Sequence, residues 1–191
     1  AASTCRRRKQ EQTSGGRETG AAVPAAHAVG DDQVAAGVLG GVHRPVGTQQ
    51  QLRELAVGRR QYRLLVKNLL TGEVYADAVD NIEANIVWAD DNRTLFYIEK
   101  DPVALLGFRV RRHLLGSDPA TDPVVWEEKD TTFYTGLGKS KSGRFIEIAS
   151  QSTVSTEVRL LDADRPTEPF RLFLPRERDH EYSVEDLGDR F

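Results

Sequence analysis

One part of the chain repeats at an interval of about fifty residues, and this repeat restricts the fold more than any other feature. Residues 88–98 (WADDNRTLFYI) align with residues 138–148 (GKSKSGRFIEI) at a shift of 50, which matches polar turn residues and sets Leu95 over Phe145. A third copy begins at residue 184, where residues 188–191 match residues 142–145 at a shift of 46. Repeats of this length are typical of folds that stack one small unit several times.

Each copy consists of a polar turn followed by short strands that end in Gly, Asp or Pro turns. Such a series, about four strands per forty to fifty residues without helical periodicity, is typical of a propeller blade. We therefore predict an all-β fold, a partial β-propeller of about two and a half four-stranded blades after a poorly structured N-terminal segment. A β-sandwich with evenly spaced strands is the alternative. The predicted strands are Tyr62–Leu69, Leu95–Ile98, Phe108–Leu115, Pro123–Trp126, Phe145–Ala149, Thr156–Asp162 and Pro169–Phe173.

The first sixty residues differ in composition from the rest. All 14 aromatic residues lie at or after Tyr62, so the beginning of the chain lacks the large side chains that dominate cores. It holds nine Lys/Arg against five Asp/Glu, a net charge of +4, whereas residues 61–191 hold 17 against 24, a net charge of −7. We predict that residues 1–57 are a low-complexity segment, disordered or derived from a frameshift, and that residues 58–191 are the partial propeller domain. A natural low-complexity leader is the alternative for residues 1–57.

Composition also excludes several classes of protein. The single Cys5 excludes an intrachain disulfide framework, and no stretch approaches the roughly 18 apolar residues that span a bilayer. Neither part of the chain has the strongly basic balance typical of nucleic-acid binding, and the short run Arg6–Lys9 is expected to be a solvated tail. We expect a cytoplasmic protein that binds neither nucleic acid nor membrane.

Several motifs are similar to the propeller domain of oligopeptidase B-like serine peptidases in the prolyl oligopeptidase family. The resemblance is carried by residues 86–103 (IVWADDNRTLFYIEKDPV), 105–116 (LLGFRVRRHLLG), 125–134 (VWEEKDTTFY), 141–145 (KSGRF) and 152–157 (STVSTE). It implies a seven-bladed propeller paired with an α/β-hydrolase domain that cleaves short peptides after Arg or Lys. It further implies that the propeller covers the active site and excludes large folded substrates.

The catalytic groups of such an enzyme are not encoded in this chain. An α/β-hydrolase nucleophile requires Gly-x-Ser-x-Gly, and this pentapeptide is absent from the sequence. The Gly138-Lys139-Ser140 tripeptide resembles part of a phosphate-binding loop, but Phe133 stands where that loop needs a glycine and a strand follows instead of a helix. We therefore predict no catalytic, cofactor-binding or metal-binding residues here, no cofactor, and no hydrolysis by the chain itself.

The four histidines, His27, His43, His113 and His180, lack partners at metal-ligand spacing. His113 is predicted to be a surface residue of an outer, solvated strand. In that strand Arg109 and Arg111 should share one face, with Arg112 on the other.

We accordingly expect a fragment of a serine-type oligopeptidase, part of the propeller that controls substrate entry and not itself catalytic. Its partners in the full-length parent would be short peptides and the α/β-hydrolase domain. The alternative is a stand-alone β-propeller that serves as a protein-interaction module.

Overall fold

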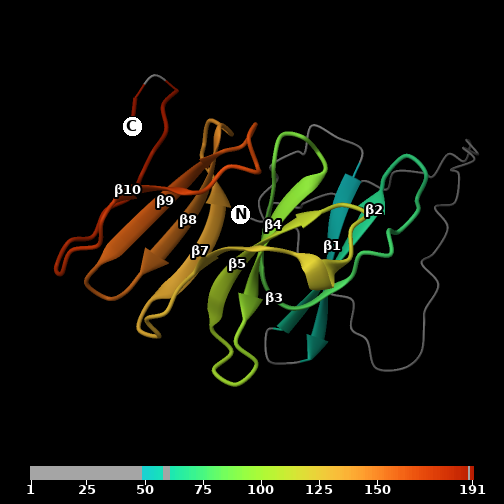
Figure 1. Ribbon diagram of the computed structural model, residues 1–191, viewed down its shortest axis with the longest axis horizontal. Coiled ribbons are helices and arrows are strands. Elements are labelled where there is room, and N and C mark those ends of the chain that lie inside the picture. Colours follow the sequence, from blue (N-terminus) through green and yellow to red (C-terminus); the bar gives the residue numbers. More distant parts are fainter. Residues whose placement is uncertain (1–48, 58–60, 189) are drawn as a thin grey trace, which may run out of the picture. The chain divides into compact units, whose positions relative to one another are not determined.

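The computed structural model describes residues 49–57, 61–188 and 190–191, and these form an all-β fold as predicted (Figure 1). One short 3-10 turn (Pro119–Thr121) is the helical element among the described residues, and none of their helices could cross a membrane. The strands are β1 (Gln49–Val57), β2 (Gln61–Asn68), β3 (Val79–Trp88), β4 (Thr94–Lys100), β5 (Gly107–Leu114), β6 (Val124–Glu127), β7 (Tyr134–Lys139), β8 (Phe145–Gln151), β9 (Thr156–Asp162) and β10 (Arg171–Leu174).

The strands form two antiparallel sheets in chain order, β1 to β6 and β7 to β10. In the first sheet, β2 and β3 are joined at two paired positions only, Tyr62↔Ile82 and Leu64↔Val79, with an irregularity between them. β3 to β6 therefore make one four-stranded unit, and β7 to β10 repeat it. The predicted strands correspond to β2, β4 to β6 and β8 to β10, while β3 and β7, the first strand of each unit, were not among them.

β1 lies within the segment 1–57 that was predicted to be poorly structured. It pairs with β2 from Gln49↔Asn68 to Val57↔Gln61, with one irregularity near its end. The first described strand thus begins at residue 49. Residues 1–48 lie outside the described residues, so the prediction for them, including the tail with Cys5, stays a prediction.

The repeat has a structural shift of 51 residues, one more than the sequence alignment gave. The turn before β4 closes with a bond from the Ala89 amide to the Thr94 carbonyl, and the turn before β8 closes the same way from Ser140 to Phe145. The left-handed residue of each turn, Asn92 with φ 55° and Gly143 with φ 82°, obeys the same spacing. Because side chains alternate between sheet faces, this one-residue difference exchanges the two faces of the aligned strands.

The two sheets pack against each other through a buried apolar layer. From the first sheet, Phe96 and Ile98 enter this layer, and from the second sheet Ile146 and Ile148 do so. Phe96 is fully buried and meets Phe170 edge to face, with 5.7 Å between ring centroids. A second buried layer on the opposite face of β3 and β4 joins them to β2; it contains Leu64, Val66, Val79, Ile82, Ile86, Trp88, Leu95 and Tyr97.

The corrected register reveals a difference between the two units at one strand position. Phe96 of β4, which points toward the second sheet, corresponds at a shift of 51 to Glu147 of β8. Because Ile146 and Ile148 point toward the first sheet, Glu147 points away from it. Burial, with Glu185 and Asp186 nearby, raises the pKa of Glu147. The outward face of the second sheet therefore carries a carboxyl group where the matching face of the first carries an aromatic ring.

Candidate functional site

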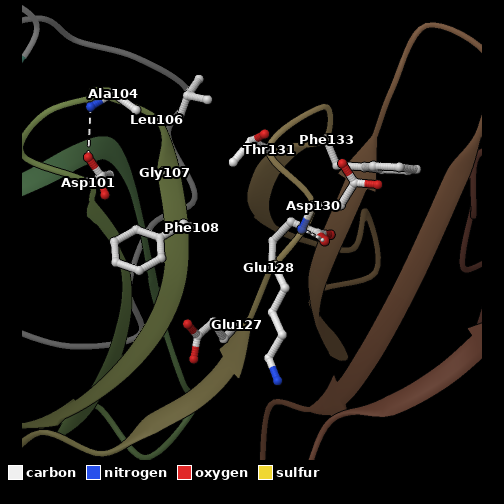
Figure 2. A pocket seen from close by; sticks show the side chains of 11 residues that line it. Asp101, Ala104, Leu106, Gly107, Phe108, Glu127, Glu128, Asp130, Thr131 and Phe133 are labelled. Atoms are coloured by element: carbon white, nitrogen blue, oxygen red, sulfur yellow. Dashed lines mark hydrogen bonds between the residues drawn. The ribbon is translucent and has the colours of Figure 1, made fainter.

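A cavity of about 280 Å³ lies between two connections of the fold, one joining β4 to β5 and the other joining β6 to β7. Asp101 and Phe108 lie on one side of it, and Asp130, Thr131 and Phe133 lie on the other (Figure 2). The full lining consists of Asp101, Ala104, Leu106, Gly107, Phe108, Glu127, Glu128, Lys129, Asp130, Thr131 and Phe133.

Local hydrogen bonds hold two of the cavity's carboxylates in place. Asp101 accepts bonds from the backbone amides of Val103 (2.8 Å) and Ala104 (2.7 Å), the second of which is drawn in Figure 2. Asp130 accepts bonds from the side chain and the backbone amide of Thr132, at 2.7 and 2.9 Å. These bonds favour the ionised form, so they lower the pKa of both carboxyl groups. Both side chains are therefore negatively charged at neutral pH.

Glu128 is the buried carboxylate of the cavity, and it is held by Arg176 from the segment after β10. Two guanidinium nitrogens of Arg176 contact Glu128, at 2.8 and 3.4 Å, and a third contacts Glu157 of β9 at 3.3 Å. The guanidinium also lies over the Phe133 ring, 4.0 Å from its centroid. Burial alone would raise the pKa of Glu128, but bonds from Arg176 and the Asp130 amide outweigh it, so the net shift is downward.

The lining is suited to the binding of a cationic or small apolar group. It combines four carboxylates and one lysine with the rings of Phe108 and Phe133. These lining residues include no serine, cysteine or histidine. Within the described part of the chain, no group of three or more His, Cys, Asp or Glu side chains could hold a metal ion.

The structure corrects the prediction for His113 and confirms that for the arginines. His113 is fully buried, because β5 is followed in its sheet by β6 and its imidazole meets two buried carboxylates, Asp77 and Asp122. Arg111 binds Glu99 of β4, whereas Arg112 reaches the Pro166 carbonyl beside the second sheet, so the two arginines lie on opposite faces. The strand is therefore an inner one, in which Arg109 and Arg111 form ion pairs.

The other residues discussed from the sequence have structural roles. Lys139 ends β7 and pairs with Asp90 of the preceding unit, and its Nζ also reaches the Trp88 carbonyl at 3.3 Å. Ser140 closes the turn that follows, since its hydroxyl accepts a bond from the Phe145 amide at 3.0 Å. His180 is exposed. His27 and His43 lie outside the described residues.

Sequence reasoning did not identify the cavity or the carboxylates around His113. The run from Glu127 to Asp130 was available as a signal, because three acids in four residues directly after a strand mark a charged loop. Asp77 and Asp122 offered no such signal, since they are separated by 45 positions and come together only through the fold.

Two successive four-stranded antiparallel units, packed face to face and preceded by two further strands, define a partial β-propeller. A model of the family described as prolyl oligopeptidase, N-terminal beta-propeller domain, matches residues 52–191. The chain therefore belongs to the prolyl oligopeptidase family and is part of its N-terminal propeller domain.

Individual relatives agree with this assignment. The chain is 51% identical over 134 residues to dipeptidyl aminopeptidase BI of Pseudoxanthomonas mexicana, covering 70% of this chain and 18% of the relative. It is 36% identical over 138 residues to Protease 2 of Moraxella lacunata, covering 69% and 19%. Among solved structures, oligopeptidase B from Leishmania major matches with a TM-score of 0.69 and 28% identity, covering 74% of this chain and 20% of that one. The chain thus spans about a fifth of the length of these relatives.

Proposed function

We propose that the chain is part of the propeller that controls substrate entry in a serine-type oligopeptidase. In this proposal an α/β-hydrolase domain supplies the activated serine, and the propeller admits short peptides while excluding folded proteins. The match of residues 52–191 to the family's propeller domain is the observation that carries it. The same match disfavours the stand-alone interaction module, because the relatives are peptidases.

Cleavage after Arg or Lys is the finer part of the proposal. It is supported by the likeness to Protease 2 and to oligopeptidase B, and the net charge of −7 over residues 61–191 would attract cationic peptides. The 51% identity to a dipeptidyl aminopeptidase favours a second candidate, release of dipeptides from peptide N-termini. A cytoplasmic location and a domain boundary at residue 57 also belong to the proposal.

A chimera can test this proposal. Residues 52–191 would replace the matching segment of the Pseudoxanthomonas enzyme, and the control would be the parent enzyme handled identically. We expect the chimera to keep kcat/KM within about tenfold of the parent on short peptides, because a compatible propeller closes the ring around the same catalytic domain. We also expect it to leave a folded protein substrate uncut. A folded chimera that loses activity on short peptides, or that degrades the folded substrate, would contradict the proposal.

The substrate preference would be measured as hydrolysis of arginyl, lysyl and dipeptidyl reporter peptides by the same chimera. The chain alone should hydrolyse none of them, because a positioned nucleophile, base and oxyanion hole are all needed for acyl transfer. Turnover by the purified chain that a serine-directed inhibitor abolishes would show that it contains a site of its own.

A further inference from the structure

The side chain of His113 lies between two carboxylates that belong to different parts of the fold. Its Nδ1 is 2.9 and 3.0 Å from the carboxylate oxygens of Asp122, and its Nε2 is 3.2 Å from Oδ2 of Asp77. The imidazole is fully buried, and the two aspartates are 8% and 5% exposed. Asp77 lies in the connection between β2 and β3, and Asp122 lies in the connection between β5 and β6.

Further bonds fix both carboxylates where they meet the imidazole. The Tyr97 hydroxyl donates to Asp122 at 3.0 Å, and Arg111 donates to the Asp122 backbone carbonyl at 2.7 Å. Asp77 accepts a bond from the Gly116 amide. The imidazole therefore joins two anchored groups, and the β2–β3 connection is attached through it to the β5–β6 connection.

Only the protonated imidazole satisfies both contacts. An ionised carboxylate accepts hydrogen bonds but cannot donate them, and a neutral imidazole has a single N–H. With a carboxylate at each ring nitrogen, the neutral form would leave one nitrogen lone pair facing a buried anion. The imidazolium donates from both nitrogens and also carries the charge that balances the aspartates.

The other charged groups around this cluster support the same protonation state. Burial alone would lower the pKa of His113, but the hydrogen bonds and charges of Asp122 and Asp77 outweigh it, so the pKa is raised. Burial and Asp122 also raise the pKa of Tyr97, which keeps its hydroxyl a donor. The nearby Arg111 is paired with Glu99 of β4 at 2.5 Å, so its charge is largely compensated.

We propose that Asp77, His113 and Asp122 form a pH-sensitive clasp that fastens the β2–β3 connection to the β3–β6 unit while the imidazole is protonated. Loss of the proton releases the contact to one of the two aspartates. The clasp lies beside the junction where β2 and β3 share only two paired positions. It therefore controls how firmly the strands before β3 are held to the unit that follows.

The pH dependence of unfolding of the whole chain tests the clasp. Because the folded-state pKa is raised, the stabilisation is complete below the unfolded value of about 6.5 and declines as the pH rises through the folded value. The unfolding equilibrium constant should therefore rise by up to about tenfold per pH unit above pH 6.5. His113→Gln should abolish this rise, whereas His180→Gln, at an exposed histidine, should retain it. Parallel pH profiles for the wild type and His113→Gln would overturn the proposal.

A second variant and a spectroscopic measurement keep the test decisive if His113→Gln does not fold. Asp77→Asn preserves the acceptor for the Gly116 amide and removes one negative charge beside His113. The pH range over which the unfolding equilibrium constant rises should therefore become narrower. Nitrogen-15 NMR of the imidazole should show both ring nitrogens protonated at pH 7 in the wild type. A neutral His113 at pH 7, or an unchanged window in Asp77→Asn, would overturn the clasp.

Discussion

Replacement of Phe96 by alanine should be among the most destabilising single changes in the described part of the chain. The side chain is fully buried in the layer between the two sheets and meets Phe170 edge to face. Truncation of a buried Phe to Ala costs about 3–5 kcal/mol, because transfer energy is lost and a cavity remains. Against a total stability of about 5–15 kcal/mol, this is a large fraction.

Urea denaturation followed by tryptophan fluorescence or circular dichroism would measure the loss. Leu70→Ala, at a side chain that is 79% exposed, is the matched control and should change the free energy of unfolding by less than about 0.5 kcal/mol. If the two variants have similar midpoints and unchanged slopes, Phe96 does not contribute to a packed layer and the reasoning fails.

A double-mutant cycle isolates the contact between the sheets. Phe96 belongs to β4 and Phe170 lies between β9 and β10, so a coupling between Phe96→Leu and Phe170→Leu reports on packing across the two sheets. An edge-to-face pair contributes about 0.5–1.5 kcal/mol beyond area burial. Strict additivity of the two substitutions would show that the rings do not interact in solution.

Two further predictions concern loops and turns. Arg176→Met leaves the buried Glu128 carboxylate without its cation, whereas Glu157 keeps its pair with Arg159. We therefore expect a loss of about 2–3 kcal/mol in chemical denaturation, below the roughly 3–5 kcal/mol of a fully buried pair because the guanidinium is partly exposed. Arg171→Met, at an exposed pair, should cost less than about 0.5 kcal/mol, and equal losses would contradict the assignment. Gly143→Ala should cost about 1–2 kcal/mol from its left-handed backbone alone, since the added Cβ meets no atom within 4 Å. Gly138→Ala has the same open surroundings without positive φ, and an equal effect there would refute strain as the cause.

The sequence predicted the strands of the repeat well, because alternating side chains and polar turns are local signals. Thr156–Asp162 has the same bounds in sequence and structure, and the ends of the other strands differ by at most two residues. β3 and β7 were missed as separate strands because β7 carries Gly136 and Gly138 and β3 carries several polar residues, which weakens the strand pattern.

The register and the charged clusters could not be obtained from local patterns. Aligning Leu95 with Phe145 matched two apolar residues, but the structure matches Leu95 with Ile146, and only turn geometry distinguishes the two choices. The arginines around His113 predict a solvated strand, whereas the structure buries this histidine. Its burial depends on Asp77 and Asp122. Tertiary packing brings these two aspartates together, and their separation in the sequence does not indicate that they are close.

Because Phe96 and Glu147 occupy equivalent positions in the two four-stranded units, tandem arrays built from one unit or from the other would differ in stability. A tandem copy of residues 79–127 would present Phe96 to the next copy and could bury it, as the native layer does. A tandem copy of residues 134–174 would instead bury the Glu147 carboxylate against apolar neighbours, which is costly without a cation. The two units are therefore not interchangeable modules, and a designed array should use the earlier one or replace Glu147 with an aromatic residue.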